Sequence, residues 1–141
     1  MAIVAVGNIE VVVRTRNEHC PPHVHADCAQ EGWDARFKFS YLDDEISFWD
    51  IRAKRKVPTI YALNQVGTAI YEKLADIRIR WWEVKGTACL DNAFVYTSGK
   101  NLALRDNRTR DAVQVVRATF DPSRSELSVE LADGTNHVQA L

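Results

Sequence analysis

The stretch His19-Cys20-Pro21-Pro22-His23-Val24-His25 decides the fold of the N-terminal part of this chain. Proline fixes its own backbone dihedral and pushes the preceding residue toward extended conformations, so two adjacent prolines exclude a helix here. Neither proline can donate a hydrogen bond to a neighbouring strand. We therefore expect the stretch to enter a β-sheet at an edge or at the first residue of a strand.

Strand patterns lie on both sides of this stretch. Residues 9–16 before it are rich in β-branched side chains, which suit a pleated sheet. Residues 33–39 after it alternate apolar and polar with a period of two, as in a strand with one buried face. A further short strand is expected at 46–49. The N-terminal third is therefore predicted to be an antiparallel meander.

The periodicity becomes helical after Pro58. Apolar residues then recur every three or four positions, which predicts one amphipathic helix from about Pro58 to about Lys85. Gly67 leaves two shorter helices as an alternative. The expected fold class is α+β, with an N-terminal antiparallel β-meander packed on a long amphipathic helix and a C-terminal β-meander.

Three parts follow from this organisation of the 141 residues. Residues 1–86 are expected to form a sheet-plus-helix domain that carries the His-Pro motif. Residues 87–111 are expected to be an irregular connection, with the polar run 105–111 as its linker. Residues 112–141 are expected to form the C-terminal β-meander.

Composition excludes several classes of function. The formal net charge is -1, so any attraction to nucleic acid must come from a local patch. Three cysteines without a Cys-Xaa-Xaa-Cys pair argue against a secreted disulfide framework. The chain starts without a signal-peptide pattern and has no long apolar run. We therefore expect a cytoplasmic protein that does not associate with a membrane.

Three of the four histidines fall within the His-Pro stretch. Imidazole binds transition metals and transfers protons near neutral pH. Alternate side chains of a strand share a face, so His23 and His25 should project the same way, and His19 can approach them only across the Pro-Pro bend.

Three interpretations of this cluster stay open. In the first, His19, His23 and His25 bind zinc or a similar ion, with Glu18, Asp27 or Cys20 as a fourth ligand. In the second, two of these histidines act as a general acid and base beside a cation such as Arg14 or Arg16. In the third, the histidines are structural and satisfy hydrogen bonds in a turn and a sheet.

A basic cluster is a second candidate site, for nucleic acid or a partner protein. It lies just before the predicted helix and consists of Arg52, Lys54, Arg55 and Lys56. Trp82, beside the apolar stripe of the helix, is a candidate for a partner contact.

The pattern His-Xaa-Pro-Pro-His-Xaa-His resembles a family of small bacterial proteins, domain-of-unknown-function family four-one-six-zero. The matching residues are 11–16, His19, Pro21, Pro22, His23, His25, 35–39 and, more loosely, the helix to 81–83, so the resemblance spans about 5–86. Such genes are often seen beside toxin–antitoxin pairs, which implies a cytoplasmic module that works with a protein partner. The family implies no established reaction.

The tail at 113–135 is similar to the start of a second family, domain-of-unknown-function family two-four-four-two, over about 30 residues. The function expected first is therefore a protein-interaction module of toxin–antitoxin type, with a protein partner or a second copy of the chain. The alternative is a metal- or histidine-dependent hydrolase that acts on nucleic acid through His19, His23 and His25. A third is nucleic-acid binding through the basic cluster.

Overall fold

The protein was analysed as a computed structural model that describes residues 2–105 and 109–141. Within these residues the chain forms two compact units, one from 1–40 and 44–85, the other from 41–43 and 86–141. Each unit contains one five-stranded antiparallel sheet. The described chain is therefore mainly β, with only two short helices.

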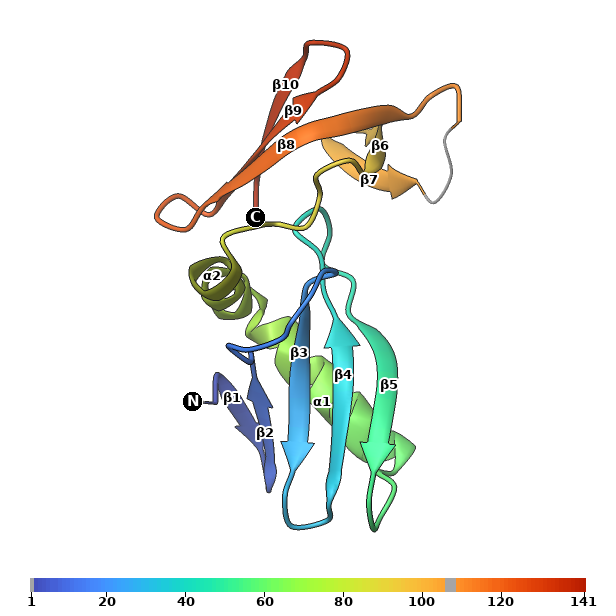
Figure 1. Ribbon diagram of the computed structural model, residues 1–141, viewed down its shortest axis with the longest axis vertical. Coiled ribbons are helices and arrows are strands. Elements are labelled where there is room, and N and C mark those ends of the chain that lie inside the picture. The colour runs from blue at the N-terminus through green and yellow to red at the C-terminus, as the bar shows by residue number, and fades with distance from the viewer. Residues whose placement is uncertain (1, 106–108) are drawn as a thin grey trace. The chain divides into compact units, whose positions relative to one another are not determined.

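The sheet of the first unit is a simple meander. Its strands follow one another in space as they do in the sequence, in the order β1-β2-β3-β4-β5 (Figure 1). They are β1 (Val4–Val6), β2 (Ile9–Val12), β3 (His23–Cys28), β4 (Trp33–Lys38) and β5 (Ser47–Ala53). Pro22 directly precedes β3, whose first residue is His23, so both prolines lie just outside the strand, where no ladder hydrogen bond is needed from them.

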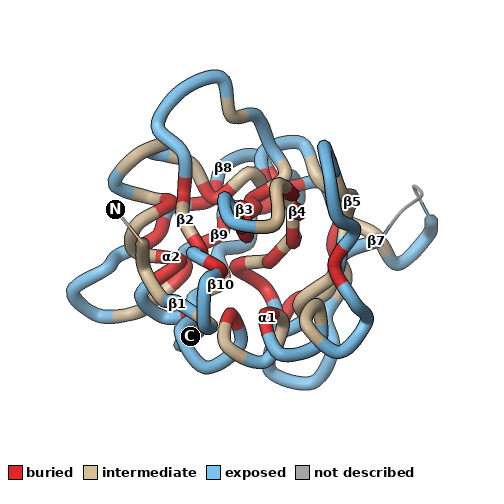
Figure 2. Tube along the Cα trace, turned by 90° about the horizontal axis from the view of Figure 1, so that it is seen from below, coloured by how far each residue is buried: buried red, intermediate tan, exposed pale blue. Residues whose placement is uncertain are grey.

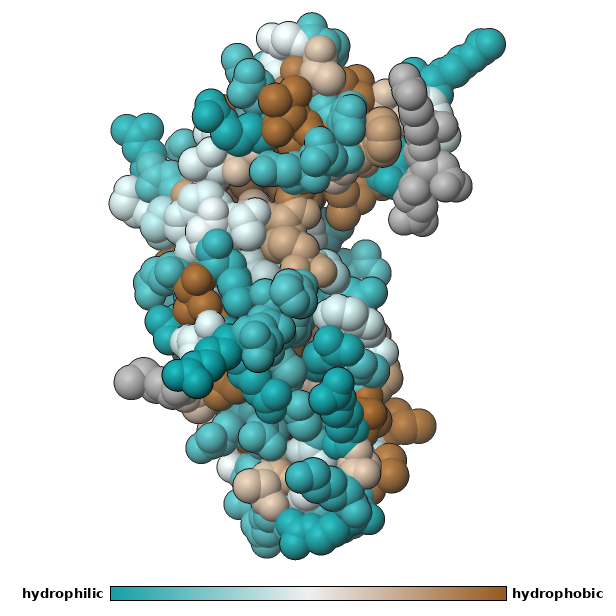
Figure 3. All heavy atoms as spheres, in the orientation of Figure 1, coloured by the Kyte–Doolittle hydropathy of each residue, from teal (hydrophilic) through white to brown (hydrophobic). Residues whose placement is uncertain are grey.

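The two faces of this sheet differ in character. Val24 lies opposite Phe37 and Ala26 opposite Ala35, and all four are buried. Helix α1 (Ile60–Glu72) crosses behind the sheet in Figure 1, and Figure 2 shows buried residues of β3, β4 and α1 in red. The front of the sheet is mainly hydrophilic (Figure 3). It carries the intervening residues of the same strands, which include the two histidines of β3.

The expectation of an α+β fold built on one long amphipathic helix is wrong. The helical region divides into α1, which begins after the N-cap Thr59, and α2 (Leu74–Lys85). The division falls at Lys73, which leaves helical geometry with φ -108° and ψ 15°, and not at Gly67, which lies inside α1. The alternative of two shorter helices is therefore the correct one, but the apolar period continues across Lys73 and gives no sign of a division there.

Length explains the division. A straight helix over 58–85 would be about 40 Å long, whereas a six-residue strand spans about 20 Å. The bend lets α2 contact a different part of the unit. The buried Arg78 donates from Nε and Nη2 to the carbonyl oxygen of Ser40, at 3.0 and 2.8 Å, and from Nη2 to Asp44 at 3.3 Å. Trp81 packs against Phe39 with ring centroids 6.1 Å apart.

The second unit contains the sheet of order β10-β9-β8-β6-β7. Its strands are β6 (Phe94–Ser98), β7 (Asn101–Arg105), β8 (Val113–Asp121), β9 (Glu126–Leu131) and β10 (Asn136–Ala140). The β6–β7 hairpin lies within 87–111, the region expected to be an irregular connection. Residues 106–108 of the expected linker lie outside the described residues. The buried Gln139 accepts from the Leu102 amide and donates to the Leu42 carbonyl oxygen.

One cysteine and the two helices bear on the expected cell compartment. Cys28 is a free, buried thiol. A cytoplasmic location stays a prediction. Neither helix among the described residues has the length and apolar character needed to cross a membrane.

Arg78→Ala should destabilise the first unit strongly. The change removes a buried charged donor and leaves the Ser40 carbonyl oxygen without it, which should lower the free energy of unfolding by about 2–3 kcal/mol in urea titrations. Arg80→Ala is the matched control on the same helix, because Arg80 forms only an exposed pair with Glu83 at 3.6 Å. Equal losses in the two variants would contradict the role given to Arg78.

Candidate functional site

The carboxylate of Glu18 lies between two buried imidazole rings. Its Oε2 is 2.5 Å from Nε2 of His23 and its Oε1 is 2.8 Å from Nε2 of His25. His23 and His25 are 2% and 5% exposed. The ligand atoms of the three residues lie within 4.8 Å of one another, so Glu18, His23 and His25 lie close enough to hold a metal ion.

The outer nitrogen of each ring faces a further oxygen. Nδ1 of His23 lies 2.8 Å from the carbonyl oxygen of Pro21, and Nδ1 of His25 lies 3.2 Å from both carboxylate oxygens of Asp34. Arg14 donates in turn to Asp34 at 3.1 Å. Such outer contacts fix the orientation of a histidine ring and direct its other nitrogen to a metal in known metal sites.

Both carboxyl groups are held in their ionised form. Burial by itself raises the pKa of Glu18, but hydrogen bonds and positive charge from His23 and His25 outweigh it, so the pKa lies below the ordinary value. Burial acts in the same direction on Asp34, and His25 and Arg14 outweigh it there, so this pKa is lowered too. At neutral pH both groups are therefore anionic acceptors.

Four ring nitrogens thus face four acceptors, since a carbonyl oxygen and an ionised carboxylate only accept. Hydrogen bonds at all four nitrogens require both rings to carry two protons each. A divalent cation in place of the two inner protons satisfies the same nitrogens and leaves the total charge of the group unchanged. The acceptor oxygens around the two rings can therefore be satisfied either by ring protons or by a metal ion.

A turn brings Glu18 over the sheet. Asn17 has φ 57°, in the left-handed region that asparagine tolerates better than most residues. Glu18 follows directly, on the segment between β2 and β3. The rings of His23 and His25 lie 5.3 Å apart, because alternate residues of β3 project to the same face. Trp49 and Trp81 enclose His23, with ring centroids 5.2 and 5.3 Å away.

The structure brings together two of the three predicted histidines. His23 and His25 meet as expected from their spacing in a strand. His19 is exposed and does not belong to the candidate metal group among the described residues. Glu18, considered from the sequence only as a fourth ligand, takes the third place. Asp27 does not join the group.

Sequence reasoning missed a polar cleft next to His25. The cleft has a volume of about 370 Å³ and lies between residues 14–18 and the front of β3, β4 and β5. Cross-strand pairs place its residues: His25 is opposite Arg36, and Arg36 is opposite Asp50. The alternation of 33–39 marked Asp34 and Arg36 as solvent-facing, but only the register shows that they lie beside the histidines.

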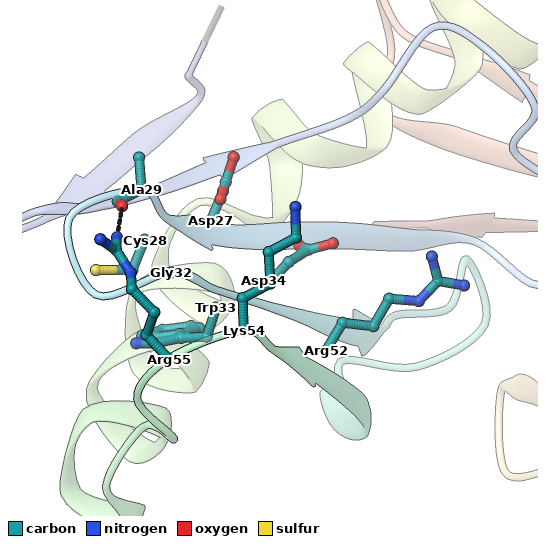
Figure 4. Close-up of a pocket in the computed structure, with 9 residues that line it drawn as sticks. All are labelled: Asp27, Cys28, Ala29, Gly32, Trp33, Asp34, Arg52, Lys54 and Arg55. Carbon is teal, nitrogen blue, oxygen red and sulfur yellow. Dashed lines mark hydrogen bonds between the residues drawn. The ribbon is translucent and has the colours of Figure 1, made fainter.

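The basic cluster does not form one surface. Arg55 donates to the carbonyl oxygens of Ala29 and Gln30, and Lys56 pairs with Glu31 at 3.1 Å. Figure 4 shows a second pocket, near the β3–β4 turn, in which Arg52 and Arg55 extend in opposite directions. Lys54 is exposed and lines that pocket as well. Arg52 lines both this pocket and the polar cleft. Trp82 is half-buried on α2.

Comparisons with known proteins add no further constraint. No family model, no curated protein and no solved structure matches this chain. The resemblance to the two families of unknown function stays a prediction, and the function must be argued from the site itself.

Glu18→Gln should destabilise the metal-free protein. The glutamine amide has only one oxygen, so it can accept a hydrogen bond from only one of the two imidazoles. Its NH₂ group would face the N–H of the other ring, and two donors cannot form a hydrogen bond. We expect the free energy of unfolding in the presence of a chelator to fall by about 1–3 kcal/mol. Glu10→Gln is the control, since Glu10 is exposed on β2 and should change stability by less than about 0.5 kcal/mol. If Glu18→Gln were as mild as its control, the carboxylate would not hold the two rings.

Proposed function

We propose that this chain is a metal-dependent hydrolase whose centre consists of Glu18, His23 and His25, with zinc as the expected ion. The observation that carries the proposal is the convergence of two buried imidazole nitrogens on one carboxylate, while the opposite nitrogen of each ring already has an acceptor. Two histidines and one carboxylate are a ligand set that zinc enzymes use.

The fit requires a small adjustment of the three ligands, whose ligand atoms lie within 4.8 Å of one another. Two ligands of one tetrahedral zinc ion at 2.0–2.1 Å lie about 3.3 Å apart. The present separations of 2.5 and 2.8 Å between carboxylate oxygens and ring nitrogens are shorter, as hydrogen bonds are. Glu18 stands on the segment between β2 and β3, so an adjustment of its carboxylate involves no residue of a strand.

Three protein ligands leave one coordination position for water, which is the arrangement of catalytic rather than structural zinc sites. Zinc lowers the pKa of a bound water to about 7 and so supplies hydroxide as a nucleophile at neutral pH. Glu18 and His25 also line the polar cleft. An ion held by them would therefore lie at the wall of a space into which a substrate can enter.

Metal content tests the centre directly. Protein purified without a metal-binding tag, then loaded with zinc and dialysed, should hold about one ion per chain by elemental analysis. His25→Ala and Glu18→Ala should lose that ion, because each removes a ligand. With cobalt in place of zinc, the visible absorption of a low-symmetry site should appear in the wild type and disappear in both variants.

His19→Ala is the decisive control, because sequence reasoning gives His19 the same role as its two neighbours. It should keep the full metal content. Asp34→Asn should weaken metal binding by about 10–100-fold without abolishing it, since Asp34 contacts the outer nitrogen of a ligand. Circular dichroism establishes that each variant is folded. Zinc retained by folded Glu18→Ala and His25→Ala would refute the centre.

As a second candidate function, we infer a protein-interaction module of toxin–antitoxin type. The supporting observation is a set of exposed apolar side chains beside β5, the last strand of its sheet. Phe48, Ile60 and Tyr71 line a groove of about 640 Å³ between β5 and α1, and hydrophobic atoms gather at this edge in Figure 3. Edge strands and exposed apolar patches recruit partners.

Self-association tests this second candidate with a second copy of the chain as partner. Sedimentation velocity at increasing concentration should show a monomer–dimer equilibrium. The double variant Phe48→Ser and Ile60→Ser should shift it to monomer, whereas Val138→Ser, at an exposed residue of β10, should not. A wild-type chain that stays monomeric at all concentrations would rule out the homodimer.

A further inference from the structure

The polar cleft is lined by four guanidinium groups. Two come from the segment after β2, one from β4 and one from β5; they are Arg14, Arg16, Arg36 and Arg52. Three carboxylates share the cleft, those of Glu18, Asp34 and Asp50. Four positive against three negative charges leave an excess of one, before the histidines or a metal ion are counted. The cleft therefore favours an anion.

Arg36 is held rigidly in this cleft. Its Nε donates to Asp50 at 2.7 Å and its Nη2 donates to the same carboxylate, so the two groups form a bidentate pair. The guanidinium also stacks on Trp49, with Cζ 3.9 Å from the ring centre. Two of its five N–H groups are used in this pair, and Nη1 makes no hydrogen bond to a described residue. A guanidinium fixed in this way loses little freedom when it binds a ligand.

Arg16 and Arg52 are the unpaired charges of the cleft. Both are exposed, and neither forms an ion pair with a described residue. Arg14 pairs with Asp34, which also contacts His25. The cleft thus combines two guanidinium groups that are paired with carboxylates, Arg14 and Arg36, with two that form no ion pair with a described residue.

We propose that this cleft binds the phosphate group of a phosphate ester. Planar guanidinium groups match the oxygens of phosphate with paired hydrogen bonds, and phosphate offers enough oxygens for donors from several directions. The inference rests on the proposed function for its catalytic meaning, because a metal ion at Glu18 and His25 would lie beside the bound group. The shared chemistry covers both a terminal phosphomonoester and a phosphodiester of a nucleic-acid backbone.

Calorimetric titration with phenyl phosphate tests the cleft on the zinc-loaded protein. The double variant Arg16→Ala and Arg52→Ala should bind at least about tenfold more weakly than the wild type, since two charged donors are lost. Arg36→Lys keeps the charge but loses the paired donors, and should weaken binding similarly. Arg124→Ala is the matched control, because Arg124 is an exposed arginine of the second unit. All variants should keep the wild-type zinc content.

The outcomes separate this inference from the proposed function. Phenyl phosphate affinity that is unchanged in both cleft variants, or absent in the zinc-loaded wild type, overturns the phosphate site and leaves the metal centre standing. If the wild type holds no zinc, the proposed function fails, and the same titrations on the metal-free chain then decide the cleft alone. On the metal-free chain, weaker binding of phenyl phosphate by the cleft variants supports the phosphate site. Unchanged or undetectable binding overturns it.

A second ligand distinguishes the two sources of phosphate. A single-stranded hexanucleotide without terminal phosphates contains only diesters. Binding of this oligonucleotide, weakened by the Arg16→Ala and Arg52→Ala change, assigns the cleft to a nucleic-acid backbone. Binding of phenyl phosphate without binding of the oligonucleotide assigns it to terminal phosphomonoesters.

Discussion

The carboxylate of Glu18, shared between two buried imidazoles, is the contact on which the described site depends. His23 and His25 lie on the hydrophilic front of a sheet whose other face packs on a helix, yet both are almost completely buried. They can be buried there because Glu18 meets both inner nitrogens, while Pro21 and Asp34 meet the outer ones. Without Glu18, two polar rings would lose a partner in a poorly solvated place, which is costly.

This contact also ties the segment between β2 and β3 to the sheet. The segment carries Arg14 and Arg16 on one side of its turn and Glu18 directly after Asn17. When Glu18 bonds to the rings, the arginines come to lie above β4 and β5, where the cleft forms. The candidate metal group and the polar cleft therefore depend on each other. The Glu18 carboxylate that bonds to the two rings also positions the segment that forms one wall of the cleft.

The sequence allowed some of this to be predicted, for physical reasons that differ by element. The period of two in β4 follows directly from backbone geometry, so the buried Trp33, Ala35 and Phe37 could be assigned. The division of the helix could not be placed correctly, because the apolar period runs through Lys73 without a glycine or proline, whereas Gly67 lies inside α1. His23 and His25 were found because they share a strand. The sequence could not show that Glu18, and not His19, completes the group. The path of a turn depends on dihedrals, such as the positive φ of Asn17, that composition does not reveal.

Surplus acceptors distinguish this cluster from histidines that only fill a core. A structural histidine that is neutral needs one acceptor for its single N–H, and its other nitrogen needs a donor. Here His23 and His25 have acceptors on both sides, two of them oxygens of one ionised carboxylate. Such an arrangement demands extra positive charge between the rings and Glu18. Protons or a divalent ion can supply it, and the proposed function rests on the second of these.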